Sequence, residues 1–177
     1  SDFDVETTPV TTGLAVSLND ICLGDNATAD ITGNLIDGSY EFTYSLSGSN
    51  SASDLTATGV FSSGDGTGSF TIPAANIGAD GNTNVIITAV SFTTGEMCSA
   101  GSLLVINNFD VEPLPNVSVL NLAVGDVCDG NDATVNITST LADGTYQFTY
   151  DLSAPNAATD LTATSTLSSG DGSGSFT

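Results

Sequence analysis

The chain repeats itself at a fixed offset of 106 residues, without a gap. Residues 37–44 read Asp-Gly-Ser-Tyr-Glu-Phe-Thr-Tyr and recur at 143–150 as Asp-Gly-Thr-Tyr-Gln-Phe-Thr-Tyr. A copy of this quality is typical of a tandem array, in which each repeat is one folding module and neighbours are joined in series. Such arrays supply length and repeated contacts more often than a single reaction.

The repeat predicts two domains, a complete module at 1–108 and an incomplete second module at 109–177. The sequence Phe-Asp-Val-Glu at 3–6 recurs at 109–112, so we expect it to open each module. Because Thr177 corresponds to Thr71, we expect the natural protein to continue beyond both ends. The short linker after residue 106, followed by two prolines, predicts a stiff joint between modules.

The residue pattern is that of an all-β protein. Threonine, valine, isoleucine and aromatic residues alternate with polar residues in short runs, and Asp-Gly pairs separate the runs. The first module predicts a single helical turn at 73–77 and seven strands at 14–18, 27–33, 39–47, 55–62, 67–72, 84–93 and 101–107. The second predicts strands at 120–124, 133–139, 145–153, 161–168 and 173–177. About seven strands in each complete module predict tandem immunoglobulin-like β-sandwiches.

The clearest strand places Tyr40, Phe42 and Tyr44 on one face. Exposed aromatic residues could form a platform on which sugars stack. The alternation of these three with Glu41 and Thr43, however, is the pattern of a strand with one face in the core. We therefore predict that the three aromatic rings are buried.

The charge is entirely of one sign. Lysine, arginine and histidine are absent, while 21 acidic residues give a formal charge of −21. Nucleic acid and anionic membranes are excluded as partners, because no side chain can neutralise a phosphate. With 40% apolar residues, the chain is not a disordered acidic tail. Repulsion among these charges favours solubility but destabilises the folded state.

The cysteines predict one disulfide bond in each complete module. Cys22 and Cys128 are repeat equivalents, while the counterpart of Cys98 would lie beyond residue 177. Two cysteines in a module of this size suggest a Cys22–Cys98 disulfide and an oxidising compartment, although free thiols are the alternative. Five predicted strands separate the two, and an odd number places them at opposite ends of a sandwich. Either one strand is wrongly assigned, near 73–82, or the thiols do not pair; we favour the first.

Several motifs resemble a known family. They are Cys-x-Gly at 22–24, Ala-Thr-x-x-Ile-Thr at 27–32, Asp-Gly-x-Tyr-x-Phe-Thr-Tyr-x-Leu-Ser at 37–47 and Gly-Ser-Phe-Thr-Ile-Pro-Ala-Ala at 68–75. The pattern resembles the immunoglobulin-like repeats of very large cell-surface adhesins in gliding and marine Bacteroidota, of the SprB gliding-motility type. The resemblance implies secretion, a filament at the cell surface, and attachment to a substrate or glycan. It implies no catalytic residues.

Enzymatic activity is not expected. A chain without histidine, lysine or arginine lacks the usual general bases and anion clamps, and eight of the 17 aspartates lie beside a glycine, where aspartate typically forms turns. Structural calcium is a sharper hypothesis, because calcium prefers carboxylate and carbonyl oxygens. The predicted strand directions place the candidate ligands at one pole of the first module and at the facing turns of the second: Asp20, Asp25, Asp110, Glu112, Asp143 and Asp171. The alternative is that these carboxylates are solvated or form turns, since no known calcium-loop motif is present.

These observations predict structural stalk repeats of a secreted bacterial cell-surface adhesin or filament that mediates adhesion or gliding. The expected partners are neighbouring repeats of the same chain, with surface glycans or other copies of the chain as further candidates. One alternative is a subunit of a self-assembling extracellular fibre, in which another chain supplies a missing strand. Another is a glycan- or ice-binding module.

Overall fold

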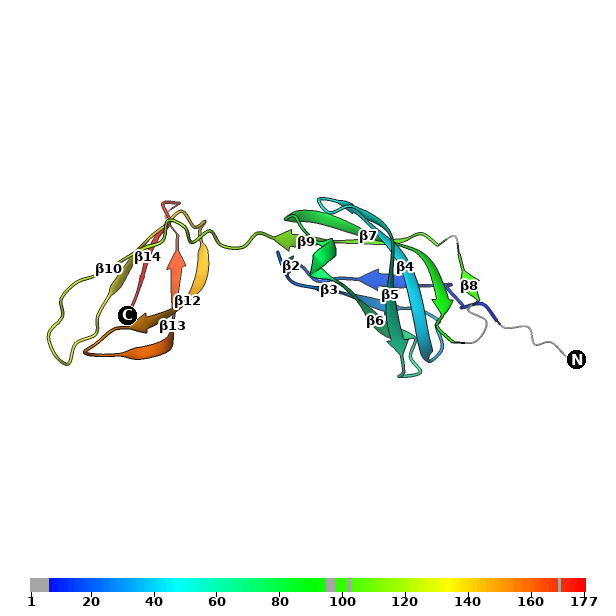
Figure 1. Cartoon of the computed structure of the whole chain (residues 1–177), viewed down its shortest axis with the longest axis horizontal. Coiled ribbons are helices and arrows are strands. Elements are labelled where there is room, and N and C mark those ends of the chain that lie inside the picture. The colour runs from blue at the N-terminus through cyan, green and yellow to red at the C-terminus, as the bar shows by residue number, and fades with distance from the viewer. Residues whose placement is uncertain (1–6, 95–97, 102, 169) are drawn as a thin grey trace, which may run out of the picture. The chain divides into compact units, whose positions relative to one another are not determined.

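The computed structural model describes residues 7–94, 98–101, 103–168 and 170–177. The chain forms two compact units, Ser1–Leu114 (unit 1) and Pro115–Thr177 (unit 2) (Figure 1). Unit 1 thus extends to Leu114, six residues beyond the predicted boundary after residue 108. Among the described residues, no helix is long and apolar enough to cross a membrane.

Unit 1 is built almost entirely from strands, as predicted. Its elements are β1 (Ala15–Ser17), β2 (Ile21–Cys22), β3 (Ala27–Thr32), β4 (Gly38–Gly48), β5 (Ala52–Phe61), β6 (Thr67–Ile72), the 3-10 turn η1 (Ala74–Asn76), β7 (Gly81–Phe92), β8 (Ser99–Ala100) and β9 (Val105–Glu112). The first six predicted strands and the helical turn are confirmed within a few residues. The short strands β2 and β8 were not predicted.

The strands of unit 1 form one curled sheet in the order β1-β3-β6-β5-β4-β7-β9-β2, with β8 beside β7 (Figure 1). Without the two-residue strands, this is the ABED and CFG order of a seven-stranded immunoglobulin-like sandwich. β5 joins the two layers, because it pairs along most of its length with β4 and at only two positions with β6. The unit is therefore an all-β sandwich, as the alternating pattern predicts.

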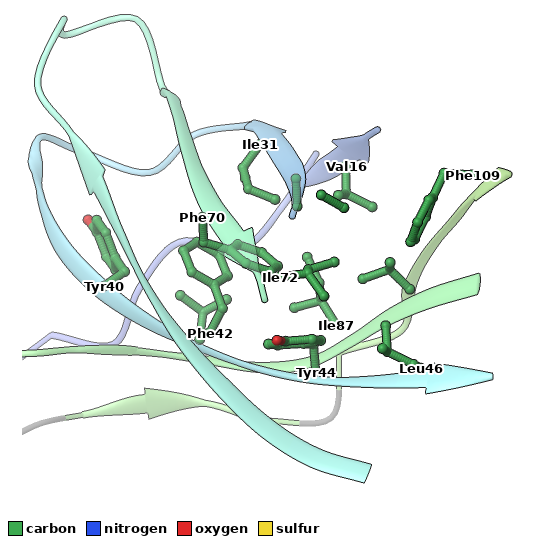
Figure 2. Packing of buried hydrophobic residues seen from close by; sticks show 14 of the residues in the cluster. Val16, Ile31, Tyr40, Phe42, Tyr44, Leu46, Phe70, Ile72, Ile87 and Phe109 are labelled. Atoms are coloured by element: carbon green, nitrogen blue, oxygen red, sulfur yellow. The ribbon is translucent and has the colours of Figure 1, made fainter. Parts of the chain in front are cut away.

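The core of unit 1 lies between these two layers. Tyr40, Phe42 and Tyr44 are completely buried, which confirms the prediction for the aromatic row of β4. Phe70 of β6 stacks on Phe42 with ring centroids 5.1 Å apart and lies 5.2 Å from the ring of Tyr44 (Figure 2). Burial of each such ring contributes about 2–3 kcal/mol. The aromatic row of β4 is thus a major source of the stability of unit 1.

The last strand of unit 1, predicted at 101–107, begins four residues later and ends five residues later in the structure, as β9 (Val105–Glu112). Asn107 and Asn108 resemble a polar linker, but β9 continues through them, and Phe109 and Val111 are buried in the core (Figure 2). The Nδ2 of Asn107 donates a hydrogen bond to the backbone carbonyl of Val16, 2.8 Å away. Residues 109–112 therefore end unit 1 instead of opening the next module, while their copy at 3–6 lies outside the described residues.

Unit 2 repeats the strands for which the chain has copies, except β2, whose counterpart at 127–128 is not in a strand. Its elements are β10 (Asn121–Val124), β11 (Val135–Thr138), β12 (Gly144–Leu152), β13 (Ala158–Leu167) and β14 (Ser173–Phe176). These strands form two small sheets, β10-β11-β14 and β12-β13. The five predicted strands are confirmed, and the described part of unit 2 holds no counterpart of β7 or β9. Its buried apolar core is accordingly small and consists of Ile137, Leu141, Leu167 and Phe176.

The Cys22–Cys98 disulfide is contradicted by the structure. Cys22 in β2 pairs with Glu112 of β9. The preceding residue of β9, Val111, lies opposite Gly81, so Cys22 is near the N-terminal end of β7. Cys98 directly precedes β8, and β8 pairs with Val90 and Ser91 near the C-terminal end of β7. The length of β7 between these points is roughly 30 Å, whereas a disulfide needs Cα atoms within about 7 Å. All five predicted strands between the cysteines are real, so the strand assignment was right and the pairing was wrong.

Candidate functional site

Two pairs of acidic residues belong to segments at the end of unit 1 where β9 finishes, which we call the C-terminal pole: Asp20 and Asp25 flank β2, and Asp110 and Glu112 lie in β9. β2 runs parallel to β9, and the backbone N–H of Leu23 donates to the carbonyl of Glu112, 2.8 Å away. One carboxylate oxygen of Asp20 accepts the backbone N–H of Asp110 at 2.8 Å. The structure therefore brings the Asp20 carboxylate to the backbone of Asp110, while the grouping of Asp20, Asp110 and Glu112 as calcium ligands stays a prediction. Asp25 lies in the turn that follows β2, where its N–H donates to the carbonyl of Cys22.

This pole does not form a ready-made metal centre. One oxygen of Asp20 is already bonded, and Asp110 accepts a hydrogen bond from the Nδ2 of Asn82 at 2.9 Å. Across the described residues, no three acidic, cysteine or histidine side chains are grouped so that they could hold a metal ion. The two remaining predicted ligands, Asp143 and Asp171, belong to unit 2. The arrangement at the pole suits attachment of β2 to β9 better than chelation.

The Asp-Gly turns have a structural role in both units. The carboxylate of Asp37 accepts the N–H of Gly64 at 2.8 Å, and Asp143 accepts the N–H of Gly170 at the same distance. Asp65 accepts both the hydroxyl of Thr67 at 2.6 Å and its N–H at 3.0 Å. These bonds, the hydroxyl bond first, lower the pKa of Asp65. The pattern is that of turn formation, which was the alternative to calcium binding.

Asp171 of unit 2 repeats the turn of Asp65. Its carboxylate accepts the hydroxyl of Ser173 at 2.6 Å and the N–H of Ser173 at 3.0 Å. The same hydrogen bonds, again the hydroxyl first, lower the pKa of Asp171. Two of the six predicted calcium ligands, Asp143 and Asp171, are therefore engaged in fixing their own turns.

The opposite end of unit 1, which we call the N-terminal pole, receives the incoming chain. Residues 7–10 border a small hollow of about 190 Å³, together with Asn34, Ile36, Tyr40 and Phe92. The Nδ2 of Asn34 donates to the carbonyl of Thr12 at 2.8 Å, and the hydroxyl of Tyr40 donates to the carbonyl of Ile36 at 2.9 Å. The incoming segment is thus held against the pole.

A second hollow of about 390 Å³ lies at the turns of residues 33–37 and 64–66. It is shallow and wide open. Its lining offers glycines, one asparagine, two apolar side chains and the carboxylates of Asp37 and Asp65, which already accept turn hydrogen bonds. Neither hollow combines a nucleophile with a base, so neither has the composition of a catalytic site.

Sequence reasoning missed the most completely bonded side chain of unit 1. Asn50 is buried, and its Nδ2 donates to the carbonyl of Ala79 and to the hydroxyl oxygen of Thr83, both at 2.8 Å. Its Oδ1 accepts the N–H groups of Gly78 and Ala79 at 2.8 and 2.9 Å. The only signal in the sequence is that Asn50 recurs as Asn156, in a loop where asparagine is ordinary.

Comparison with known proteins does not assign the chain to a family. No protein-family model matches the chain, and no curated protein matches it. Its function must therefore be argued from the repeat, the fold and the two poles.

Proposed function

We propose that this chain is a structural spacer, a set of stalk repeats from a secreted bacterial surface adhesin or filament. The observation that carries the proposal is the path of the chain through unit 1. The chain enters at the N-terminal pole, against Tyr40 and Phe92, and leaves at the C-terminal pole, after Glu112. Because the two ends of a module lie at opposite poles, each further repeat adds to the length of the whole.

The pairing at the C-terminal pole suits a protein that carries tension. β2 and β9 are parallel, with Ile21 opposite Val111 and Cys22 opposite Glu112. A pull on the two ends of unit 1 draws these neighbouring strands in opposite directions along their length. Their hydrogen bonds lie across this direction, so they share the load and must break together. This arrangement supports a mechanical role for the module.

The charge of the chain is consistent with the same role. A charge of −21 without any cationic side chain makes neighbouring stalks repel one another, and it leaves no cleavage site for trypsin-like proteases. Within this proposal, adhesion itself is assigned to other parts of the adhesin, and the repeats described here provide length. Surface location and secretion are part of this proposal and rest on the resemblance of the repeat motifs.

The proposal is tested by the length of tandem repeats. We would join two, three and four copies of residues 10–115 and measure the maximum dimension of each by small-angle X-ray scattering. The twelve residues of β7 span unit 1, so each copy should add roughly 40 Å. A dimension that grows only as the cube root of mass would show a compact particle and refute the spacer.

A matched control isolates the joint. Replacing residues 113–115, Pro-Leu-Pro, by Gly-Ser-Gly keeps the folded modules and removes the stiff segment. The increase per copy should then become smaller with each added module. An equal increase in both series would show that the prolines have no part in stiffening the stalk.

The proposed spacer function does not include calcium binding. One oxygen of Asp20 and one of Asp110 already accept N–H groups, and no three acidic side chains are grouped among the described residues, so the residues present fit calcium poorly. The calcium hypothesis stays a prediction, and its test is given in the Discussion.

A further inference from the structure

The two layers of unit 1 separate between β5 and β6. β6 pairs with β3 along its whole length, from Thr67 to Ile72, but with β5 only at Val60 and Phe61. The first part of β5 therefore has β4 on one side and, among the described residues, no strand on the other (Figure 1). All seven strands of the sandwich are present in unit 1, so this free edge is a feature of the fold itself.

The backbone groups on this edge follow from the pairing of β4. The hydroxyl of Thr88 in β7 donates to the carbonyl of Thr43 at 3.3 Å, so Thr43 directs its backbone groups toward β7. In an antiparallel pair, two residues that lie opposite each other direct their backbone groups either toward each other or both away. Thr56 lies opposite Thr43, so its N–H and C=O face the free edge of β5. Because the direction alternates along a strand, those of Thr58 do so as well.

The side chains along this edge form an inner apolar row and an outer polar row. Leu55 and Ala57 pack against the core but stay partly exposed, whereas Thr56 and Thr58 are exposed on the outer face. Proteins usually protect an edge strand with lysine, proline or an inward-pointing charge. The stretch 55–61 contains no proline and no charged residue, so its edge is open to another strand.

Charge selects the strand that fits. Asp54 lies near the start of β5, Glu41 lies opposite Thr58, and the whole chain carries a formal charge of −21 without any cationic side chain. A second copy of the chain would bring the same charge to this edge and is repelled. A cationic segment is attracted, and its basic side chains meet the outer face that carries Glu41. The inner row calls for apolar side chains that cover Leu55 and Ala57.

We propose that the edge of β5 over residues 52–58 is an acceptor for an extended cationic peptide segment, in which apolar and basic residues alternate, bound by β-augmentation. Main-chain hydrogen bonds to Thr56 and Thr58 hold the segment antiparallel to β5, the direction that β6 takes before it leaves the edge. The apolar side chains of the segment cover Leu55 and Ala57, and its basic side chains lie on the outer face. In the described part of unit 2, β13 pairs with β12 alone, so the edge recurs with the repeat. Binding at this edge does not depend on the spacer function.

The test is a titration of the full chain with a capped peptide of alternating lysine and valine, long enough to cover residues 52–58. Hydrogen exchange followed by NMR should show the amides of Thr56 and Thr58 exchanging at least about tenfold more slowly when the peptide is bound. The amides of β4 should not change, because β4 already lies between β5 and β7. Binding should weaken when the ionic strength rises from about 0.1 M to about 1 M, because the screening length falls from about 10 Å to about 3 Å.

Two matched peptides control for specificity. Replacing the lysines by glutamates reverses the charge, whereas gathering the lysines in one half and the valines in the other keeps the charge and removes the alternation. Neither peptide should slow exchange at Thr56. Equal protection by the glutamate peptide would show that charge has no part in the binding, and equal protection by the block peptide would show unspecific attraction to an acidic surface. Either result overturns the proposal, and so does absence of saturable binding by the alternating peptide.

Variants of the chain test the edge itself. Thr56→Pro removes an N–H on the free side, where an edge strand tolerates proline, and it should abolish the protection of Thr58. Thr56→Val keeps the N–H and should bind the peptide as the parent chain does. If Thr56→Pro does not fold, methylating the peptide amides that face β5 removes the same hydrogen bonds from the other side. Protection that survives either change contradicts the proposal, as does self-association through β5, seen by sedimentation, that the peptide does not reverse.

Discussion

Replacement of Asn50 by alanine should destabilise unit 1 strongly. Asn50 joins the loop after β4 to the segment before β7 through four hydrogen bonds, and only 4% of its surface is exposed. Alanine removes all four bonds and leaves a cavity. The hydroxyl of Thr83 is completely buried and cannot recover a partner from water, whereas the N–H of Gly78 lies in an exposed residue and can.

The magnitude follows from this distinction. A buried polar group left without a partner costs about 1–3 kcal/mol, and a bond regained from water costs about 0.5–1.5 kcal/mol. Since some of the four groups are rehydrated, we expect Asn50→Ala to lower the free energy of unfolding of unit 1 by about 3 kcal/mol. With a urea dependence of about 2 kcal/mol per molar, the midpoint should fall by roughly 1.5 M.

The assay must report unit 1 separately from unit 2. Hydrogen exchange of the β4 amides as a function of urea gives the unfolding free energy of unit 1 alone. The repeat supplies the control, because Asn156 is the counterpart of Asn50 and is exposed. Asn156→Ala should change the stability of unit 2 by less than about 0.5 kcal/mol. A loss below about 1 kcal/mol in Asn50→Ala, or equal losses in the two variants, would refute the reasoning.

Four further outcomes are expected. Burial raises the pKa of Tyr44 above 10.0, with a smaller opposing effect of the Asn76 side chain, so the stability of unit 1 should be complete below pH 10 and fall as the pH rises through the folded-state pKa. Tyr44→Phe should reduce this alkaline loss in pH-dependent melts, while at neutral pH it should cost little, because the Tyr44 hydroxyl has no hydrogen bond of good geometry among the described residues. A thiol reductant should leave the melting temperature unchanged, because Cys22 forms no disulfide; a fall of several degrees would contradict this. Calcium and sodium chloride of equal ionic strength should raise the melting temperature equally through screening, and a larger rise with calcium that EDTA reverses would establish specific sites after all. Leu23→Pro removes the N–H that bonds to Glu112 and should lower the unfolding force measured by atomic force microscopy, whereas an unchanged force would show that β2 and β9 do not carry the load.

Much of the fold could be predicted from the sequence because it is encoded by short-range patterns. The alternation along β4 predicted its buried face, and the Asp-Gly pairs predicted the turns. The errors arose where a polar residue has a long-range partner. Asn107 and Asn108 were interpreted as a linker, but Asn107 bonds to Val16, which lies far away in the chain, and the strand continues. No local pattern distinguishes a linker asparagine from one that bonds across a sandwich.

The predicted site shows the same limit. Strand directions correctly brought Asp20 to Asp110, because direction follows from counting strands. They could not show that the carboxylate of Asp20 already holds an N–H group, since that depends on side-chain geometry. Counting also gave the right answer for the cysteines, as an odd number of strands separates Cys22 from Cys98. The number of cysteines favours a disulfide, but the strand count, which opposes it, is the better guide here.

The two copies of the β4–β5 hairpin separate what is local from what is global in this fold. Asp54 and Asp160 both adopt a positive φ, 55° and 56°, and the strand register shifts at the same place in both hairpins. The hairpin in unit 2 keeps this geometry although no strand covers the second edge of β12 within the described residues. Its backbone is therefore specified by its own turn and cross-strand pairs. The burial of Tyr44, by contrast, requires strands β7 and β9, which the described part of unit 2 does not contain. The geometry of the hairpin is therefore local, whereas the burial of its aromatic row depends on the strands that complete the sandwich.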